Sequence, residues 1–171
     1  MITTSFKLSE SELYESLVDI SKSKFVVKAF RVIGIPLLFI TVLLIVFNNV
    51  IGNSFLNFRL IFPIIFSVYM VFISEISAKF QVTKLLKKKN PVIENMQISV
   101  DSNYFTLTGE SFNINMSLEK LHSIIETKKF FLLKVSDGSA NIIPKRALTI
   151  NDVIQFKNII STVPGLQVKL K

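Results

Sequence analysis

Two long apolar stretches, separated by a short connection, constrain the fold of this chain more than any other feature. The first covers residues 32–51 without a charged residue, and the second covers residues 60–77 and meets its first acid at Glu75. At about 1.5 Å per residue, a helix of this length spans roughly 30 Å, the thickness of one hydrocarbon core. Because lipid offers no hydrogen-bond partner to the backbone, both stretches are predicted to form a transmembrane helical hairpin. The alternative, a hairpin buried inside a soluble protein, is disfavoured because too little chain remains to wrap it.

Basic residues flank the hairpin on its outer ends, while the connection at residues 52–59 contains Arg59 alone. They are Lys22, Lys24, Lys28 and Arg31 before the first span, and Lys79, Lys84, Lys87, Lys88 and Lys89 after the second. Lys and Arg near span ends are retained on the cytoplasmic side, so we expect both termini to be cytoplasmic. The many Asn, Ile and Lys residues suggest a low-GC bacterial genome. The predicted location is therefore a bacterial cell membrane, crossed twice.

The hairpin divides the chain into four predicted regions. Residues 1–31 hold an N-terminal strand and an amphipathic helix, and residues 32–78 hold the hairpin. Residues 79–91 form a basic linker, and residues 92–171 form a cytoplasmic β-domain with a C-terminal helix. Together they predict an α+β membrane protein in which a two-helix hairpin is joined to a small antiparallel β-sheet capped by a helix.

Residues 2–8 alternate between apolar and polar side chains, which predicts a short strand. This strand needs a partner for its apolar face, so we expect it to pair with the sheet that begins at Met96. Ser9 and Glu12 then have the spacing of a capping box, and the helix that follows is expected to run into the first span with a bend at the interface.

After residue 92 the apolar period changes from helical to two, which predicts a meander of strands. The expected strands cover residues 96–100, 104–108, 112–116, 121–126, 130–135 and 141–143. A last helix is expected to begin near Thr149 or Asn151 and to continue to about Ile160, followed by the helix-ending pair Pro164-Gly165.

The sequence offers little catalytic chemistry. There is no cysteine, and the single histidine, His122, lies on the predicted exposed face of a strand without a partner acid or nucleophile nearby in sequence. No glycine-rich phosphate loop and no cluster of metal-ligating residues is present, so we expect neither an enzyme nor a bound cofactor or metal. The net charge of +8 is concentrated at the span flanks, which argues against nucleic-acid binding.

Glu75 has two interpretations because it lies inside the second span. An acid within a span can mark a proton or ion site. However, Glu75 lies one helical turn before Lys79, near the predicted cytoplasmic end. We therefore favour an interfacial ion pair between Glu75 and Lys79.

Two groups of cations are candidate contacts for lipid headgroups or for an acidic partner. Lys87, Lys88 and Lys89 follow the second span, and Lys145 and Arg146 follow Pro144. Anionic headgroups are the natural counter-charge for such residues beside a membrane. For Lys145 and Arg146 a structural interpretation is favoured, in which Pro144 ends an edge strand and the two cations are solvated.

The segment "MSLEKLHSIIE", the strand "FFLL" and the segment "IIPKRAL" before a final helix resemble the YcxB-like membrane proteins. The resemblance covers nearly the whole chain, although the family often has a tryptophan where this sequence has Leu118. It implies a pleckstrin-homology-like half-barrel of seven strands capped by a C-terminal helix. It implies no biochemical activity.

Two functional hypotheses follow. The first is a non-enzymatic membrane protein whose β-domain binds a protein or lipid partner at the inner leaflet. The second is an immunity protein that protects the producing bacterium from a membrane-active secreted toxin, since spans can block a pore-former by helix packing. The expected partners are membrane lipids and a protein, either a toxin or a membrane complex, and the sequence is compatible with an oligomer. A transporter or channel is disfavoured because two spans with one peripheral acid offer no polar path unless several copies assemble.

Overall fold

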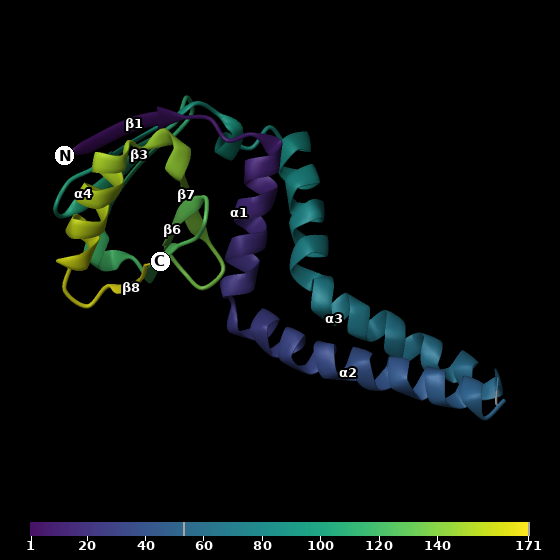
Figure 1. Ribbon diagram of the computed structural model, residues 1–171. Coiled ribbons are helices and arrows are strands. Elements are labelled where there is room, and N and C mark those ends of the chain that lie inside the picture. The colour runs from purple at the N-terminus through teal and green to yellow at the C-terminus, as the bar shows by residue number, and fades with distance from the viewer. Residues whose placement is uncertain (53, 171) are drawn as a thin grey trace.

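The computed structural model, which describes residues 1–52 and 54–170, has a β-domain and a long helical hairpin with one helix between them (Figure 1). The helices are α1 (Glu10–Ser23), α2 (Phe25–Val50), α3 (Ser54–Lys87) and α4 (Ile150–Ser161). The strands are β1 (Ile2–Phe6), β2 (Met96–Val100), β3 (Tyr104–Thr108), β4 (Asn113–Ser117), β5 (Ser123–Glu126), β6 (Phe130–Lys134), β7 (Ala140–Pro144) and β8 (Gln167–Lys169). Three 3-10 turns cover Pro91–Ile93, Leu118–Lys120 and Lys145–Ala147.

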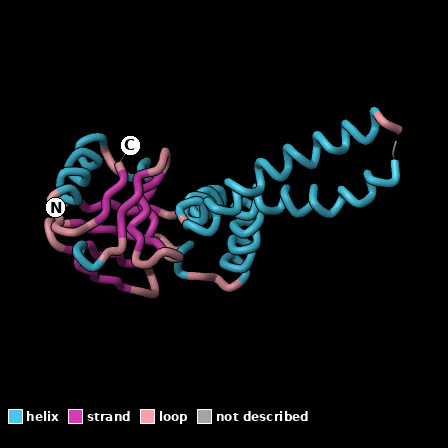
Figure 2. Tube along the Cα trace, turned by 90° about the horizontal axis from the view of Figure 1, so that it is seen from below, coloured by secondary structure: helices cyan, strands magenta, loops and turns pink. Residues whose placement is uncertain are grey.

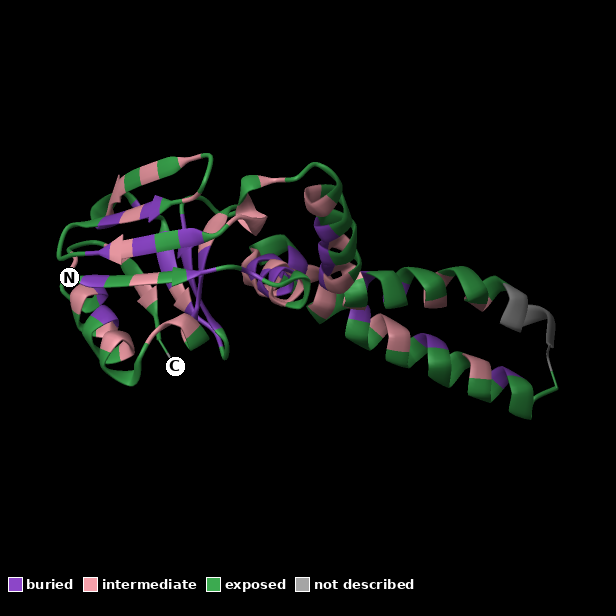
Figure 3. Ribbon diagram, turned by 90° about the horizontal axis from the view of Figure 1, so that it is seen from above, coloured by how far each residue is buried: buried purple, intermediate pink, exposed green. Residues whose placement is uncertain are grey.

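The hairpin consists of α2 and the first part of α3, which extend away from the rest of the molecule (Figures 1 and 2). Both predicted spans are confirmed as helices that are long and apolar enough to cross a membrane. Most of their apolar side chains are exposed, as the green ribbon of Figure 3 shows. The buried positions of α2 recur every seven residues, at Val27, Gly34, Thr41 and Asn48. This narrow stripe of mostly small or polar residues packs against α3, as expected for helices that associate within lipid.

The path of the chain changes direction at both ends of the hairpin, before α2 and within α3 (Figure 1). Between α1 and α2 the helical path is interrupted at Lys24, whose backbone is extended (φ −69°, ψ 138°), so the bend expected before the first span is present. The last turns of α3 instead continue as one helix alongside α1 (Figure 1). Ala78 and Val82 are buried there. The predicted linker of residues 79–91 is therefore largely the end of α3.

The β-domain contains two four-stranded sheets rather than one, with strand orders β1-β2-β3-β4 and β7-β6-β5-β8. The predicted pairing of the N-terminal strand is confirmed, because β1 lies antiparallel to β2 from Ile2 opposite Val100 to Phe6 opposite Met96. The meander divides after β4, where Leu118 turns into the core and is fully buried. The sequence did not predict β8, a three-residue strand parallel to β5.

The core lies between the two sheets, and α4 covers one side of it (Figures 2 and 3). Phe156 of α4 packs edge-on against Phe131 of β6, with ring centroids 4.9 Å apart. All five residues of β6 are buried, because this strand lies between β5 and β7, contributes to the core and contacts α1. Hence α1 is held between the β-domain on one side and α3 on the other.

Candidate binding cleft beside α1

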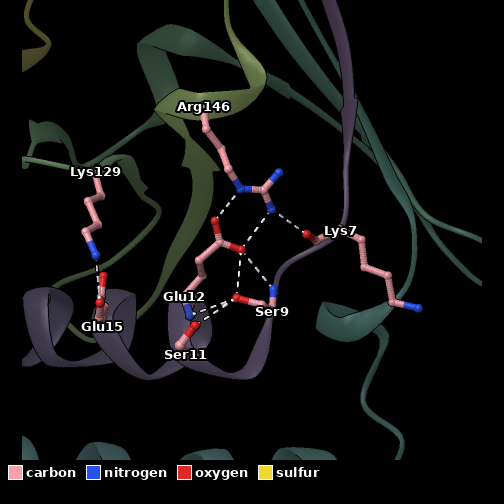
Figure 4. Close-up of polar contacts among 7 residues, drawn as sticks. All are labelled: Lys7, Ser9, Ser11, Glu12, Glu15, Lys129 and Arg146. Atoms are coloured by element: carbon pink, nitrogen blue, oxygen red, sulfur yellow. Dashed lines mark hydrogen bonds and ion pairs between the residues drawn. The ribbon is translucent and has the colours of Figure 1, made fainter.

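Ion pairs fix the N-terminal end of α1 to the β-domain (Figure 4). Glu12 accepts hydrogen bonds from the Arg146 guanidinium, which also donates to the backbone oxygen of Lys7 at 2.8 Å. The same carboxylate completes the capping box with Ser9. The hydrogen bond from Arg146 lowers the pKa of Glu12 to about 2. A second pair joins Lys129 Nζ to Glu15 Oε1 at 2.8 Å.

Lys145 lies beside Arg146 but has a different role. Its ammonium contacts Oε1 of the buried Glu126 at 2.6 Å and lies 5.1 Å from the centroid of the Phe131 ring. Lys157 of α4 contacts the other oxygen of Glu126 at 2.8 Å. The carboxylate thus links the turn after β7 to α4. Pro144 ends β7, which is an edge strand of its sheet, as the structural interpretation of this segment predicted. The expectation that Lys145 and Arg146 are solvated is wrong, because both form ion pairs with acids of the folded chain.

Glu75 joins three helices at the base of the hairpin. Its carboxylate contacts Lys22 of α1 at 2.9 Å and accepts two hydrogen bonds from Arg31 of α2, at 2.8 and 3.0 Å. Arg31 also donates to the backbone oxygen of Val71 at 3.1 Å. Glu75 therefore forms an ion pair, as predicted, but the prediction that Lys79 is its partner is wrong. Lys79 lies on the exposed surface of α3, whereas α1 and α2 bring their cations to the acid.

An open cleft of about 730 Å³ lies between α1 and the strands β5 and β6. One wall is a face of α1 that includes Tyr14, Val18 and Lys22, and the other includes the β5–β6 turn at residues 127–129. Lys28 of α2 and Glu75 of α3 line the same cleft. The cleft is therefore formed jointly by the β-domain and by the helices that lead into the hairpin.

The charged side chains of the cleft divide into paired and unpaired groups. Lys134 is almost completely buried and donates to Asp137 at 3.0 Å and to the Ser23 hydroxyl at 3.2 Å. The hydrogen bond from Lys134 lowers the pKa of Asp137. Among the described residues, no ion-pair partner is found for three cations and one acid that line the cleft: Lys28, Lys128, Lys169 and Asp19. The unpaired charge is therefore mainly positive.

The candidate contact residues come from two places in the chain, the end of α3 and the 3-10 turn Lys145–Ala147. Lys87 ends α3, and Lys88 and Lys89 follow it on the exposed surface. Lys145 and Arg146 have the intramolecular acidic partners described above, which favours their structural role. His122 is exposed, as expected, and lines the cleft that sequence reasoning missed. No local motif marks this cleft, because its walls come from segments more than a hundred residues apart.

The comparisons with known proteins found a family model that matches part of the chain. A family model described as YcxB-like protein matches residues 100–160, a segment that runs from the end of β2 nearly to the end of α4. This match confirms the YcxB-like resemblance for that segment, which includes the Lys145–Arg146 turn and one wall of the cleft. Searches of curated proteins and of solved structures found no match.

Proposed function

We propose that this YcxB-like chain is a non-enzymatic membrane protein that binds an anionic group in the cleft beside α1, at the cytoplasmic surface of the membrane. The observation that carries the proposal is the composition of the cleft, to which Lys28 of α2 and Glu75 of α3 contribute together with the β5–β6 turn. A ligand in this cleft would contact the β-domain and the base of the hairpin at once.

The charges of the cleft indicate the chemistry of the ligand. Three cations without an ion-pair partner among the described residues, against one such acid, favour an anionic group. The buried ammonium of Lys134 has three N–H groups, of which two have the acceptors named above. Each cation near an anionic leaflet contributes about 1 kcal/mol. The phosphate of a lipid headgroup is the nearest source of such an anion.

A lipid-binding measurement tests the proposal. Full-length protein in detergent is titrated with phosphatidylglycerol or with phosphatidylcholine, and bound lipid is counted by native mass spectrometry. We expect tighter binding of phosphatidylglycerol, weakened about tenfold or more in the double variant Lys128→Gln, Lys169→Gln. The double variant Lys7→Gln, Lys120→Gln removes the same charge from exposed positions outside the cleft and should bind like the parent protein.

Equal binding of the two lipids, or equal loss in both double variants, would contradict a headgroup site in the cleft. In that case the anionic group belongs to a protein partner, and a photo-reactive residue placed at Lys128 in cells should cross-link to that partner. The immunity role stays a prediction, because no contact among the described residues favours it.

A further inference from the structure

We propose that the last part of α3, residues 76–87, lies along the membrane surface, with Phe80 inserted among the headgroups and Lys84 and Lys87 in contact with anionic lipid. The partner of this surface is the bilayer that the hairpin spans. The inference rests on the transmembrane placement in the proposed function but not on the cleft.

This part of α3 has two unlike faces. Ala78 and Val82 are buried on the face that packs against α1. The opposite face exposes Phe80 over 74% of its surface and Ile76 over 36%. At 100° per residue, Lys84 and Lys87 project within about 40° of Phe80, and both are exposed. An apolar patch is thus followed by cations along one side of the helix.

The arrangement of the elements gives this face its direction. Two perpendicular views show the last turns of α3 on the hairpin side of α1, with the β-domain beyond α1 (Figures 1 and 3). The face opposite α1 therefore turns to the side from which the hairpin extends. When the hairpin spans a bilayer, headgroups occupy that side.

The chemistry of the face fits this environment. A large aromatic side chain with apolar neighbours gains free energy by entering the headgroup region, whereas in water it would remain hydrated. Lysines beside it can extend their ammonium groups to lipid phosphates. The face is also continuous with the hairpin, because α3 runs as one helix from the span into this segment. Continuity and charge together favour lipid over a protein partner.

Tryptophan fluorescence tests the proposal because the chain contains no tryptophan. Three single probes are placed in the full-length protein by Phe80→Trp, Phe39→Trp and Tyr104→Trp. Phe39 is 64% exposed within α2, and Tyr104 is 50% exposed on β3. The protein is reconstituted in phosphatidylcholine–phosphatidylglycerol vesicles whose acyl chains carry bromine either near the headgroup or near the methyl end.

We expect the Phe80→Trp probe to lose most of its emission with bromine near the headgroup and little with bromine near the methyl end. The Tyr104→Trp probe should be quenched by neither lipid. Adding Lys84→Gln and Lys87→Gln to Phe80→Trp should reduce the quenching, whereas Lys7→Gln and Lys120→Gln should leave it unchanged.

The Phe39→Trp probe separates the two proposals. If it is not quenched, the hairpin is not in lipid and the transmembrane placement itself is wrong. If it is quenched while Phe80→Trp is not, only the surface placement of α3 is overturned. A Phe80→Trp probe that is shielded from acrylamide yet indifferent to bromine would place a protein, such as a second copy, on this face and would also overturn the proposal.

Discussion

At the scale of single residues, Glu12 connects the start of α1 to the β-domain through its contacts with Ser9 and Arg146 (Figure 4). We expect Glu12→Gln to lower the free energy of unfolding by about 1 kcal/mol at pH 7, because glutamine keeps the capping box but loses the ion pair. The folded-state pKa, about 2, lies below the ordinary value of 4.5. The stabilisation is therefore present above pH 4.5 and is lost as the pH falls through 2.

Thermal unfolding of the parent protein and of Glu12→Gln, measured from pH 7 down to pH 2, checks this expectation. The difference between their midpoints should shrink as the pH falls. Ser9→Ala serves as the control, because it removes the cap without removing the carboxylate that pairs with Arg146. If the difference in unfolding midpoint between the parent protein and Glu12→Gln does not depend on pH, the destabilisation comes from altered packing and not from the lost charge.

The partners of individual charges were the part of the site that the sequence predicted least well. Capping boxes join residues three apart, so the one at Ser9 and Glu12 was visible in the sequence and is confirmed. Arg146 is 134 residues from Glu12, and only the folded chain brings them together. The same reason explains why the predicted partner of Glu75, Lys79, is wrong. The i, i+4 rule considers one helix, whereas the cations that contact Glu75 come from two other helices.

At the scale of elements, Glu75 connects α1, α2 and α3 at the base of the hairpin. We expect Glu75→Gln to destabilise the protein by about 1–2 kcal/mol, because it leaves Lys22 and Arg31 without their shared carboxylate. Lys79→Gln changes the net charge by the same amount, with opposite sign, but should cost less than about 0.5 kcal/mol. Unfolding in mixed micelles measures both variants. A larger loss of unfolding free energy for Lys79→Gln than for Glu75→Gln would contradict this prediction and favour an ion pair between Glu75 and Lys79.

Close packing of α2 on α3 depends on Gly34. A Cβ at this position would lie 2.9 Å from Met70 Cβ and 3.3 Å from a methyl group of Val71. Because Met70 Cβ is fixed to the helix backbone, Gly34→Ala must push the helices apart, at an expected cost of about 1–3 kcal/mol. Ile35→Ala alters a neighbouring side chain that is 58% exposed and should have a much smaller effect in the same micelle assay. Equal stability of the parent protein and Gly34→Ala would show that the helices are loosely packed.

The elements themselves were largely predictable, with instructive exceptions. The alternation in residues 2–8 predicted β1, and the need to bury its apolar face predicted the pairing with β2. The division into two sheets could not be predicted from the alternation of apolar and polar residues. That alternation indicates which face of a strand is buried but not which strands pair with it. β8 is only three residues long and follows a helix, so its pattern was too short to distinguish from a loop.

At the scale of the whole molecule, the hairpin is inserted between two neighbouring strands of one sheet. β1 precedes the hairpin and β2 follows it, yet the two pair along their full length. Their hydrogen bonds require residues 6 and 96 to come together across the whole segment between them. The sheet is therefore expected to complete late in folding, since pairing between segments so distant in sequence requires closure of a long loop.

The same insertion constrains the topology of the protein in a membrane. Because β1 and β2 belong to one sheet, the two ends of the hairpin must lie on the same side of the bilayer. From the basic residues at those ends we expect this side to be the cytoplasmic one. The chain has no cysteine, so single cysteines introduced by Ile51→Cys, Thr3→Cys and Ser136→Cys can report each location. All three positions are exposed in the structure.

In intact cells we expect a membrane-impermeant maleimide to label Ile51→Cys only, and to label Thr3→Cys and Ser136→Cys after the membrane is permeabilised. Labelling of Thr3→Cys and Ser136→Cys, but not Ile51→Cys, in intact cells would invert the topology and place the β-domain outside. Opposite behaviour of Thr3→Cys and Ser136→Cys would be a more serious contradiction, because a sheet that contains both β1 and β2 cannot form across a bilayer. Comparing Ile51→Cys with the other two variants tests the orientation expected from the basic residues. Comparing Thr3→Cys with Ser136→Cys tests the fold.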